Sequence, residues 1–279
     1  MLIELLKTLL IGIVQGVTEW LPVSSTGHMI LLDELIHLNV SDAFMELFRV
    51  VIQLGSILAV LVLYFRKLNP FALSKTQREK KDTWTLWFKV AVAVLPSAVI
   101  GLMLDDWFDA HFYNYITVAV TLVAYGVVFL FLDKMGAGKK NVVDKTQNIS
   151  WRTAFLIGCF QVLAIIPGTS RSGSTIIGAM LFGLTRAAAA EFSFFMAIPT
   201  MLGASGLKAV KFLLDGAGAT GTEVMVLLTG CVVSFVVSLA VIKGLMEYVR
   251  KHSFSLFGLY RIALGLLVLI YFVVFQVIL

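Results

Sequence analysis

The sequence predicts an all-α integral membrane protein with six transmembrane helices and two re-entrant helical hairpins, arranged as an inverted-topology repeat. Three observations predict this fold class. Of the 279 residues, 59% are hydrophobic and 14% are charged, whereas a soluble domain is nearer half apolar and a quarter charged. Six apolar segments have the length of a membrane span. Two polar, helix-breaking motifs lie among the remaining apolar segments, roughly half the chain apart.

The six long apolar segments each hold the roughly 17–25 residues that a transmembrane helix needs. Their predicted boundaries are Leu47–Phe65, Trp87–Leu104, Ile116–Leu132, Ala187–Leu207, Val224–Ile242 and Phe257–Leu279. The N-terminus lacks the basic cluster and the cleavage site of a secretory signal, so we expect no cleaved leader. Cys159 and Cys231 lie inside apolar segments and indicate no disulfide framework or metal site.

Four shorter apolar segments form two pairs, and each pair flanks one polar motif. The segments are Leu2–Val14, Met29–Leu38, Thr153–Ile166 and Ser174–Leu184. Between the members of each pair, Pro22 or Pro167 and a run of Ser, Thr and Gly end one helix and begin the next. Two half-helices joined by a polar turn predict a re-entrant hairpin. Such backbone is tolerated at membrane depth only where protein buries it or where it lines a wet cavity.

The two motifs resemble copies of one sequence, "GIVQGVTEWLPVSSTGH" and "GCFQVLAIIPGTSRSG". Gln15 precedes Gln161 by 146 positions, and Ser25 precedes Ser170 by 145. Three spans lie between the motifs, and an odd number of spans inverts the second copy relative to the first. We therefore predict a single membrane domain, 1–279, made of inverted repeats 1–134 and 153–279 joined by a basic cytoplasmic loop, 135–152.

Charged residues orient this arrangement. Lys and Arg gather in the segments 66–89 and 134–152, and the stretch between these segments is acidic, "DDWFDAH" from Asp105. Because basic loops stay in the cytoplasm, the first hairpin is predicted to enter from outside, the second from inside, and both termini to lie outside. The net charge of +5 is explained by these loops, so no nucleic-acid partner is predicted.

The turns of the two hairpins carry the residues with chemical potential. Glu19 and His28 in the first turn are expected to face Arg171 in the second, and a charge inside the membrane marks a functional site. The Arg171 guanidinium suits phosphate oxygens. Ser25 and His28 share a helical face, which predicts a nucleophile and its base, with Glu19 orienting His28 or handling a proton. Hydroxyls and backbone N–H groups beside them predict an anion cradle of Ser24, Thr26, Gly27, Thr169, Ser170, Ser172 and Gly173.

Structural roles are the alternatives for several of these residues. Ser24 and Thr26 also suit the cap of the helix that follows them. Arg171 also suits an ion pair with Glu19 that only locks the hairpins together.

Three further polar residues are expected to be structural. We expect Gln15 and Gln161 to hydrogen-bond between the hairpins rather than perform chemistry. Arg261, inside the last predicted span, needs a buried partner or a lipid headgroup, and we expect a structural role for it.

The segments "EWLPVSSTGH" and "PGTSRSG" closely resemble the two signature motifs of the bacterial undecaprenyl-diphosphate phosphatases, the bacitracin-resistance membrane family. The resemblance covers the whole chain. It implies an enzyme that hydrolyses undecaprenyl diphosphate to undecaprenyl phosphate and inorganic phosphate, recycling the lipid carrier of peptidoglycan and other envelope polymers. The catalytic set that it implies is Glu19, Ser25, His28 and Arg171. It also implies a divalent cation, Mg²⁺ or Ca²⁺, with Glu19 as the candidate ligand, and no organic cofactor.

The resemblance places the chain in the bacterial cytoplasmic (inner) membrane, with undecaprenyl diphosphate and membrane lipid as partners, and a homo-oligomer is compatible with it. Because the first hairpin enters from outside, we expect hydrolysis at the outer-leaflet face. The alternative function is a transporter or flippase of a phosphorylated lipid or anion, since inverted repeats and broken helices are common among transporters.

Overall fold

The computed structural model describes residues 1–112, 114–132, 143–216 and 218–278. These residues form α-helices and two short 3₁₀ helices, and their only β-structure is an isolated bridge between Val143 and Leu184. Six of the described helices are long and apolar enough to cross a membrane. The prediction of an all-helical, multi-pass membrane protein is therefore confirmed.

Each predicted span coincides with one long helix, with two exceptions at the ends. The span predicted as Leu47–Phe65 passes the end of its helix at Leu63, and Leu279 falls outside the described residues. The six helices are α3 (Asp42–Leu63), α5 (Gln77–Phe112), α6 (Tyr115–Leu132), α9 (Arg186–Leu214), α10 (Gly221–Lys251) and α11 (Ser255–Ile278). Most are longer than predicted because backbone hydrogen bonding continues beyond the apolar residues. In α10, Thr220 and Glu223 form a capping box before the apolar segment, and the helix continues to Lys251 after it.

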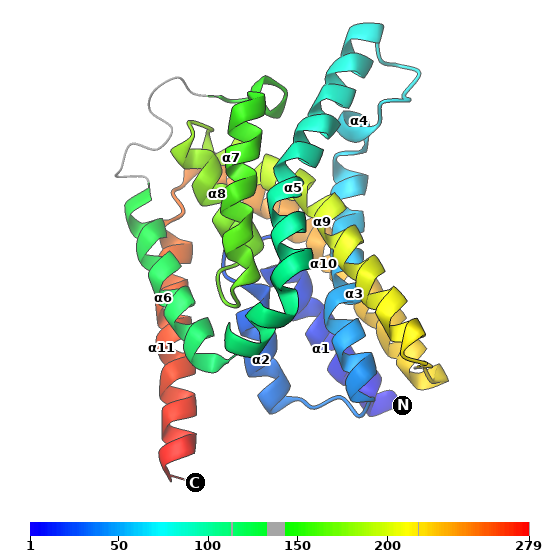
Figure 1. Cartoon of the computed structure of the whole chain (residues 1–279), viewed down its shortest axis with the longest axis vertical. Coiled ribbons are helices and arrows are strands. Elements are labelled where there is room, and N and C mark those ends of the chain that lie inside the picture. The colour runs from blue at the N-terminus through cyan, green and yellow to red at the C-terminus, as the bar shows by residue number, and fades with distance from the viewer. Residues whose placement is uncertain (113, 133–142, 217, 279) are drawn as a thin grey trace.

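Shorter helices carry the two motifs. They are α1 (Leu2–Thr18), α2 (Ser25–Leu35), α7 (Trp151–Val162), its 3₁₀ extension (Leu163–Ile165) and α8 (Arg171–Leu181), while α4 (Phe65–Leu68) is a single turn after α3. Figure 1 shows α1 and α2 in the lower half of the molecule and α7 and α8 in the upper half. The N-terminus and the end of α11 lie at the lower end, opposite α4 and the start of α5.

Close helix packing holds the second motif at the centre of the fold. α8 is buried from Ser172 to Met180, and it packs between α7 and α9. α7 in turn approaches α5 so closely that a Cβ atom at Gly158 would lie 2.0 Å from the Ala93 carbonyl oxygen. Only glycine permits this approach of two backbones. The first residues of α8 are thus placed by a rigid scaffold rather than by a loose loop.

Candidate active site

The two turns share one backbone conformation, a serine with positive φ immediately before a helix. Ser24 and Ser170 immediately precede α2 and α8, and both have positive φ angles, 70° and 72°. Each serine Oγ caps its helix by accepting a hydrogen bond from a glycine N–H, from Gly27 at 3.3 Å and from Gly173 at 3.2 Å. Positive φ is strained for residues other than glycine and is concentrated at functional sites. The capping role that the sequence offered as an alternative for Ser24 is therefore observed.

The predicted alignment of Ser25 with Ser170 is wrong by one residue. The shared caps align Ser24 with Ser170, 146 positions apart, so that Ser25 and Arg171 are the first residues of α2 and α8. The reason is that the second turn has one more residue between its proline and its cap than the first. Two of the candidate catalytic residues thus occupy equivalent places in the two turns.

Glu19 connects the two turns. Its Oε1 atom lies 3.1 Å from Nη2 of Arg171. Its Oε2 atom accepts hydrogen bonds from Nε2 of Gln15 at 2.9 Å and from Oγ of Ser25 at 3.1 Å. Glu19 is buried, so this carboxylate is compensated by charge and by hydrogen bonds from both motifs.

The Arg171 guanidinium is held by several contacts, but its Nε–H donor is unpaired among the described residues. Nη1 donates to the Ser193 carbonyl oxygen at 2.9 Å, and the guanidinium lies 5.9 Å from the centre of the Trp20 ring. Its buried Nε has no hydrogen-bond partner among the described residues. An unpaired buried donor is costly unless a ligand satisfies it. The position of Arg171 therefore suits an anion that enters beside Glu19.

His28 lies one helical turn beyond Ser24 but makes different contacts from those predicted. Its Nδ1 is 2.8 Å from the Ser24 carbonyl oxygen, and its Nε2 is 2.6 Å from Oη of Tyr260. A carbonyl only accepts hydrogen bonds, so in the neutral ring Nδ1 carries the hydrogen and Nε2 accepts from the tyrosine. Among the described hydrogen bonds, the Ser25 hydroxyl is joined to Glu19 and not to His28.

The remaining predicted binding residues differ in burial and in their contacts. Ser172 reaches across to the first turn, where its Oγ donates to the carbonyl oxygens of Glu19 and Leu21 at 3.3 Å each. Thr169 is buried, whereas Thr26 is exposed. The first N–H groups of any helix lack an intrahelical partner. In α2 and α8 these groups lie near Glu19, because the first residue of each helix contacts its carboxylate. The N–H groups, rather than the hydroxyl of Thr26, are therefore the donors that an anion beside Glu19 would meet.

The predicted hydrogen bonds of the two glutamines between hairpins are wrong. Gln15 donates to Glu19 within its own hairpin. Gln161 donates to Oγ of Ser97 at 2.5 Å and to Oγ1 of Thr200 at 3.2 Å. Ser97 lies on α5, which packs on α7, and Thr200 lies on α9, which packs on α5. These neighbouring helices, not the opposite hairpin, supply the partners of Gln161.

Arg261 on α11 binds both turns at once. It is fully buried. Nη1 donates to the Pro22 carbonyl oxygen at 3.2 Å, and Nη2 donates to the carbonyl oxygens of Gly168 at 2.9 Å and Thr169 at 3.0 Å. The buried partners that the sequence demanded are thus backbone carbonyls at the tips of the two hairpins, in keeping with the expected structural role.

Sequence reasoning missed two residues at the site. Tyr260 contacts His28, which lies 232 residues earlier, and Ser193 contributes the carbonyl that holds Arg171. Both lie in ordinary apolar helices, and no motif or spacing marks them. Only the packing of α11 and α9 against the turns brings them to the site.

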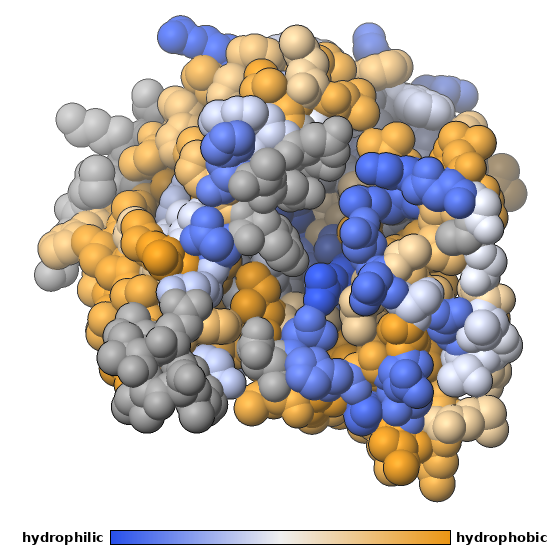
Figure 2. Space-filling view, turned by 60° about the horizontal axis from the view of Figure 1, so that its bottom comes forward, coloured by the Kyte–Doolittle hydropathy of each residue, from blue (hydrophilic) through white to orange (hydrophobic). Residues whose placement is uncertain are grey.

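The lower face of the molecule is polar at its middle. Figure 2 shows hydrophilic residues gathered in a band through the centre of this face, with hydrophobic residues on both sides. The first hairpin lies in this lower half (Figure 1). This face therefore combines a polar region with apolar surface beside it.

Comparisons with known proteins cover almost the whole chain. Residues 8–267 match the family described as bacitracin resistance protein BacA. Among curated relatives, proteins named undecaprenyl-diphosphatase from Streptococcus pyogenes serotypes M3, M1 and M18 are each 54% identical over 271 residues, which is 97% of this chain and 97% of the relative.

Proposed function

The chain belongs to the bacitracin resistance protein BacA family, and from this membership we propose that its two turns form the site at which it dephosphorylates undecaprenyl diphosphate. The chain is an undecaprenyl-diphosphatase, which releases undecaprenyl phosphate and inorganic phosphate and so recycles the lipid carrier for peptidoglycan and envelope polymer synthesis. The observation that carries the proposed site is the Glu19 carboxylate, which contacts Arg171 from one hairpin and Ser25 from the other.

Binding begins with charge. A diphosphate brings several negative charges, and Arg171 with its unpaired Nε supplies donors in a planar fork. The N-termini of α2 and α8 add backbone N–H groups and the positive ends of their dipoles. When the diphosphate binds Arg171, the ion pair with Glu19 weakens, and the carboxylate is freed to accept a proton. The Glu19–Arg171 pair then serves the reaction as well as locking the hairpins.

The contact between Ser25 and Glu19 changes the proposed roles. Ser25 Oγ attacks the terminal phosphorus, its proton passes to Glu19, and the bond between that phosphorus and the bridging oxygen breaks to release undecaprenyl phosphate. Water then hydrolyses the phosphoserine. His28, held by Ser24 and Tyr260, is the candidate for the second proton transfer. A water molecule positioned by Ser25 is the alternative nucleophile.

Two variants distinguish these nucleophiles. With Ser25 as nucleophile, Ser25→Ala is expected to lower phosphate release by about 10³-fold or more, since the residual catalysis comes from binding and electrostatics alone. Acid quenching of the wild-type reaction with undecaprenyl diphosphate labelled at its terminal phosphate should trap label on Ser25. Near-normal hydrolysis by Ser25→Ala, with His28→Ala inactive, would instead assign the attack to water.

A divalent cation, Mg²⁺ or Ca²⁺, remains part of the proposal. Among the described residues, no group of three His, Cys, Asp or Glu side chains gathers to hold a metal ion. Magnesium is often held by one or two carboxylates together with substrate phosphates, and Glu19 is the carboxylate that fits such an arrangement here. The ion would neutralise diphosphate charge.

Several contacts support the proposed inverted repeat of 1–134 and 153–279. α1 packs on α10 as α7 packs on α5, and α3 packs on α9. Glu46 near the start of α3 pairs with Lys208 near the end of α9 at 3.4 Å, and Glu191 near the start of α9 pairs with Lys67 just beyond α3. Such matching pairs are what a two-fold axis that exchanges the halves predicts. Part of the joining loop lies outside the described residues.

The proposed orientation follows from the inverted repeat. The first hairpin enters from outside and the second from the cytoplasm as re-entrant hairpins, both termini are external, and the headgroup is hydrolysed at the outer-leaflet face of the inner membrane. The separation of both ends of the chain from the basic α4 region supports this orientation (Figure 1).

The function is tested by phosphate release from undecaprenyl diphosphate by the purified chain in detergent, without an ion gradient. Hydrolysis with turnover is expected. A transporter or flippase would bind the lipid and leave the diphosphate intact, so binding without phosphate release would favour that alternative.

A further inference from the structure

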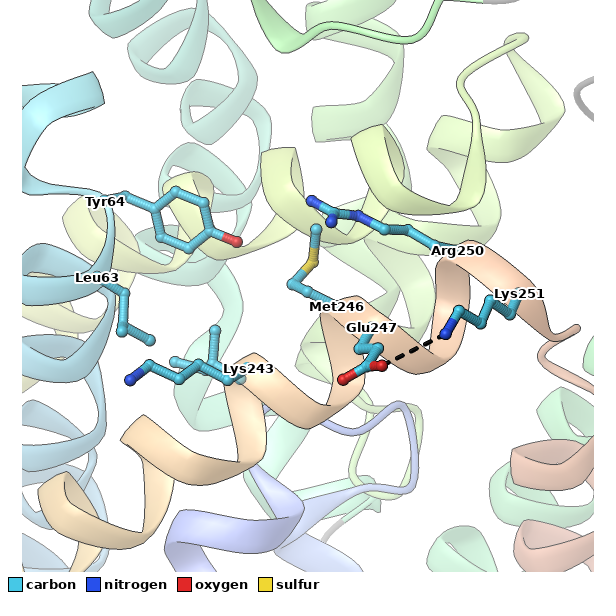
Figure 3. Close-up of a pocket in the computed structure, with 8 residues that line it drawn as sticks. Leu63, Tyr64, Lys243, Met246, Glu247, Arg250 and Lys251 are labelled. Carbon is cyan, nitrogen blue, oxygen red and sulfur yellow. Dashed lines mark hydrogen bonds and ion pairs between the residues drawn. The ribbon is translucent and has the colours of Figure 1, made fainter.

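A cavity lies between the end of α3 and the last third of α10. It has a volume of about 580 Å³ and is lined by Leu63, Tyr64, Ile242, Lys243, Met246, Glu247, Arg250 and Lys251. Figure 3 shows the lining residues of α10 along one helix, with Leu63 and Tyr64 across from them. Neither Glu19 nor Arg171 lines it, so it is not part of the phosphatase site.

The cavity carries uncompensated positive charge. Lys251 pairs with Glu247 at 3.4 Å, and neither Lys243 nor Arg250 has an ion-pair partner among the described residues. The nearby Glu191 carboxylate is occupied by Lys67 and by Oγ1 of Thr146. Two cations therefore face the same cavity without an ion-pair partner among the described residues, because the one carboxylate that lines it, Glu247, pairs with Lys251.

The two cations lie on one face of α10 and line the same cavity. Lys243 and Arg250 are seven residues apart on α10, hence two turns and roughly 10 Å along the same helical face. In Figure 3 the Arg250 side chain extends toward Tyr64 and the Lys243 side chain toward Leu63. The Tyr64 hydroxyl lines the same cavity and is a further hydrogen-bond donor there.

Apolar surface leads away from the cavity into the span. On α10, Val232 and Val236 lie on the same helical face as Lys243, and on α3, Leu58 and Val62 precede Tyr64; all four are more than half exposed. On α10 the exposed face therefore changes from apolar to basic at the level of the cavity. This change marks the boundary between hydrocarbon and headgroups in a membrane protein.

We propose that this cavity binds an anionic phospholipid of the surrounding leaflet, with Lys243 and Arg250 facing its charged headgroup and its acyl chains along the exposed residues of α3 and α10. Basic pockets between helices at the charged end of a membrane protein are suited to anionic headgroups. Cations near the C-terminus of α10 also stabilise the helix by interacting with its dipole. This interaction does not occupy the hydrogen-bond donors of Lys243 and Arg250, which can still bind a lipid headgroup.

The proposal is tested by native mass spectrometry of the purified full chain from micelles with equal amounts of phosphatidylglycerol and phosphatidylcholine. The wild type should retain the anionic lipid preferentially. The double variant Lys243→Gln/Arg250→Gln should lose this preference by about ten-fold, and each single variant by about three-fold, because each cation contributes separately. An equal loss of charge at exposed positions outside the cavity, Arg78→Gln/Arg152→Gln, should leave the preference unchanged.

Two further arms make the outcomes decisive. Phosphate release from undecaprenyl diphosphate in detergent should be the same for the double variant and the wild type, which shows that the fold is intact. Soluble glycerol phosphate should not displace the bound lipid; displacement would mean that the cavity takes a free phosphate. A wild-type lipid preference in the double variant, or an equal loss in the control, would overturn the proposal.

Discussion

Arg171→Ala is expected to lower kcat/KM for undecaprenyl diphosphate by about 10³-fold, the range seen when a positioned donor or arginine is removed from a phosphoryl-transfer site. The substitution removes the charge that binds the diphosphate and the donors that meet charge developing on the transferred phosphoryl group. It also leaves Glu19 without its ion-pair partner. The initial rate of phosphate release, measured over a range of substrate concentrations, gives this ratio directly.

Arg171→Lys serves as the matched control. Lysine keeps the positive charge but not the planar fork that also reaches the Ser193 carbonyl oxygen, so an intermediate loss is expected. Arg152→Gln, on the exposed surface, should have normal activity. If Arg171→Ala stays within about ten-fold of the wild type, the arginine is only a structural lock, because charged transition-state contacts are worth more than this.

Arg261→Met is expected to produce the largest loss of stability of any single substitution at the site, about 3–5 kcal/mol, since three turn carbonyls lose their buried donor. Methionine keeps much of the length of the side chain, so the effect reports on hydrogen bonds and charge rather than on a cavity. The midpoint of thermal unfolding in detergent should fall by several degrees. Activity should fall with it, because both turns lose their common anchor.

A comparison with Arg66→Met separates this anchor from a general effect of losing a cation. Arg66 is an exposed residue in the single-turn helix α4, so its replacement should leave the unfolding midpoint nearly unchanged. An unchanged midpoint in Arg261→Met as well would contradict the role of Arg261 in joining the turns.

The spans and the breaks between them were predictable from the sequence because both depend on local properties. Apolar length identifies α3 and α9, and Pro22 and Pro167 mark breaks because each stands beside a run of Ser, Thr and Gly. Proline alone does not mark a break, since Pro96 and Pro199 lie inside α5 and α9. The ends of α5 and α10 were not predictable in the same way. Charged residues continue a helix as readily as apolar ones, so hydropathy does not locate its last turn.

The candidate site was predictable only in part. A buried carboxylate and a buried guanidinium need each other, and the structure brings Glu19 and Arg171 to 3.1 Å. The expected hydrogen-bonded pair of Ser25 and His28 is absent from the described contacts, because a left-handed Ser24 starts α2 and turns Ser25 toward Glu19. No sequence pattern predicts this φ angle or the contact of His28 with Tyr260.

The most direct test of the account is a double-mutant cycle in phosphate release with Glu19→Gln, Arg171→Ala and both together. If residues of the two hairpins act on one diphosphate, the double variant should be about as active as the less active of the two single variants. The reason is that the losses of activity are not additive for groups that act as a unit. Losses that multiply would mean that the two turns act independently, and the shared site would be refuted.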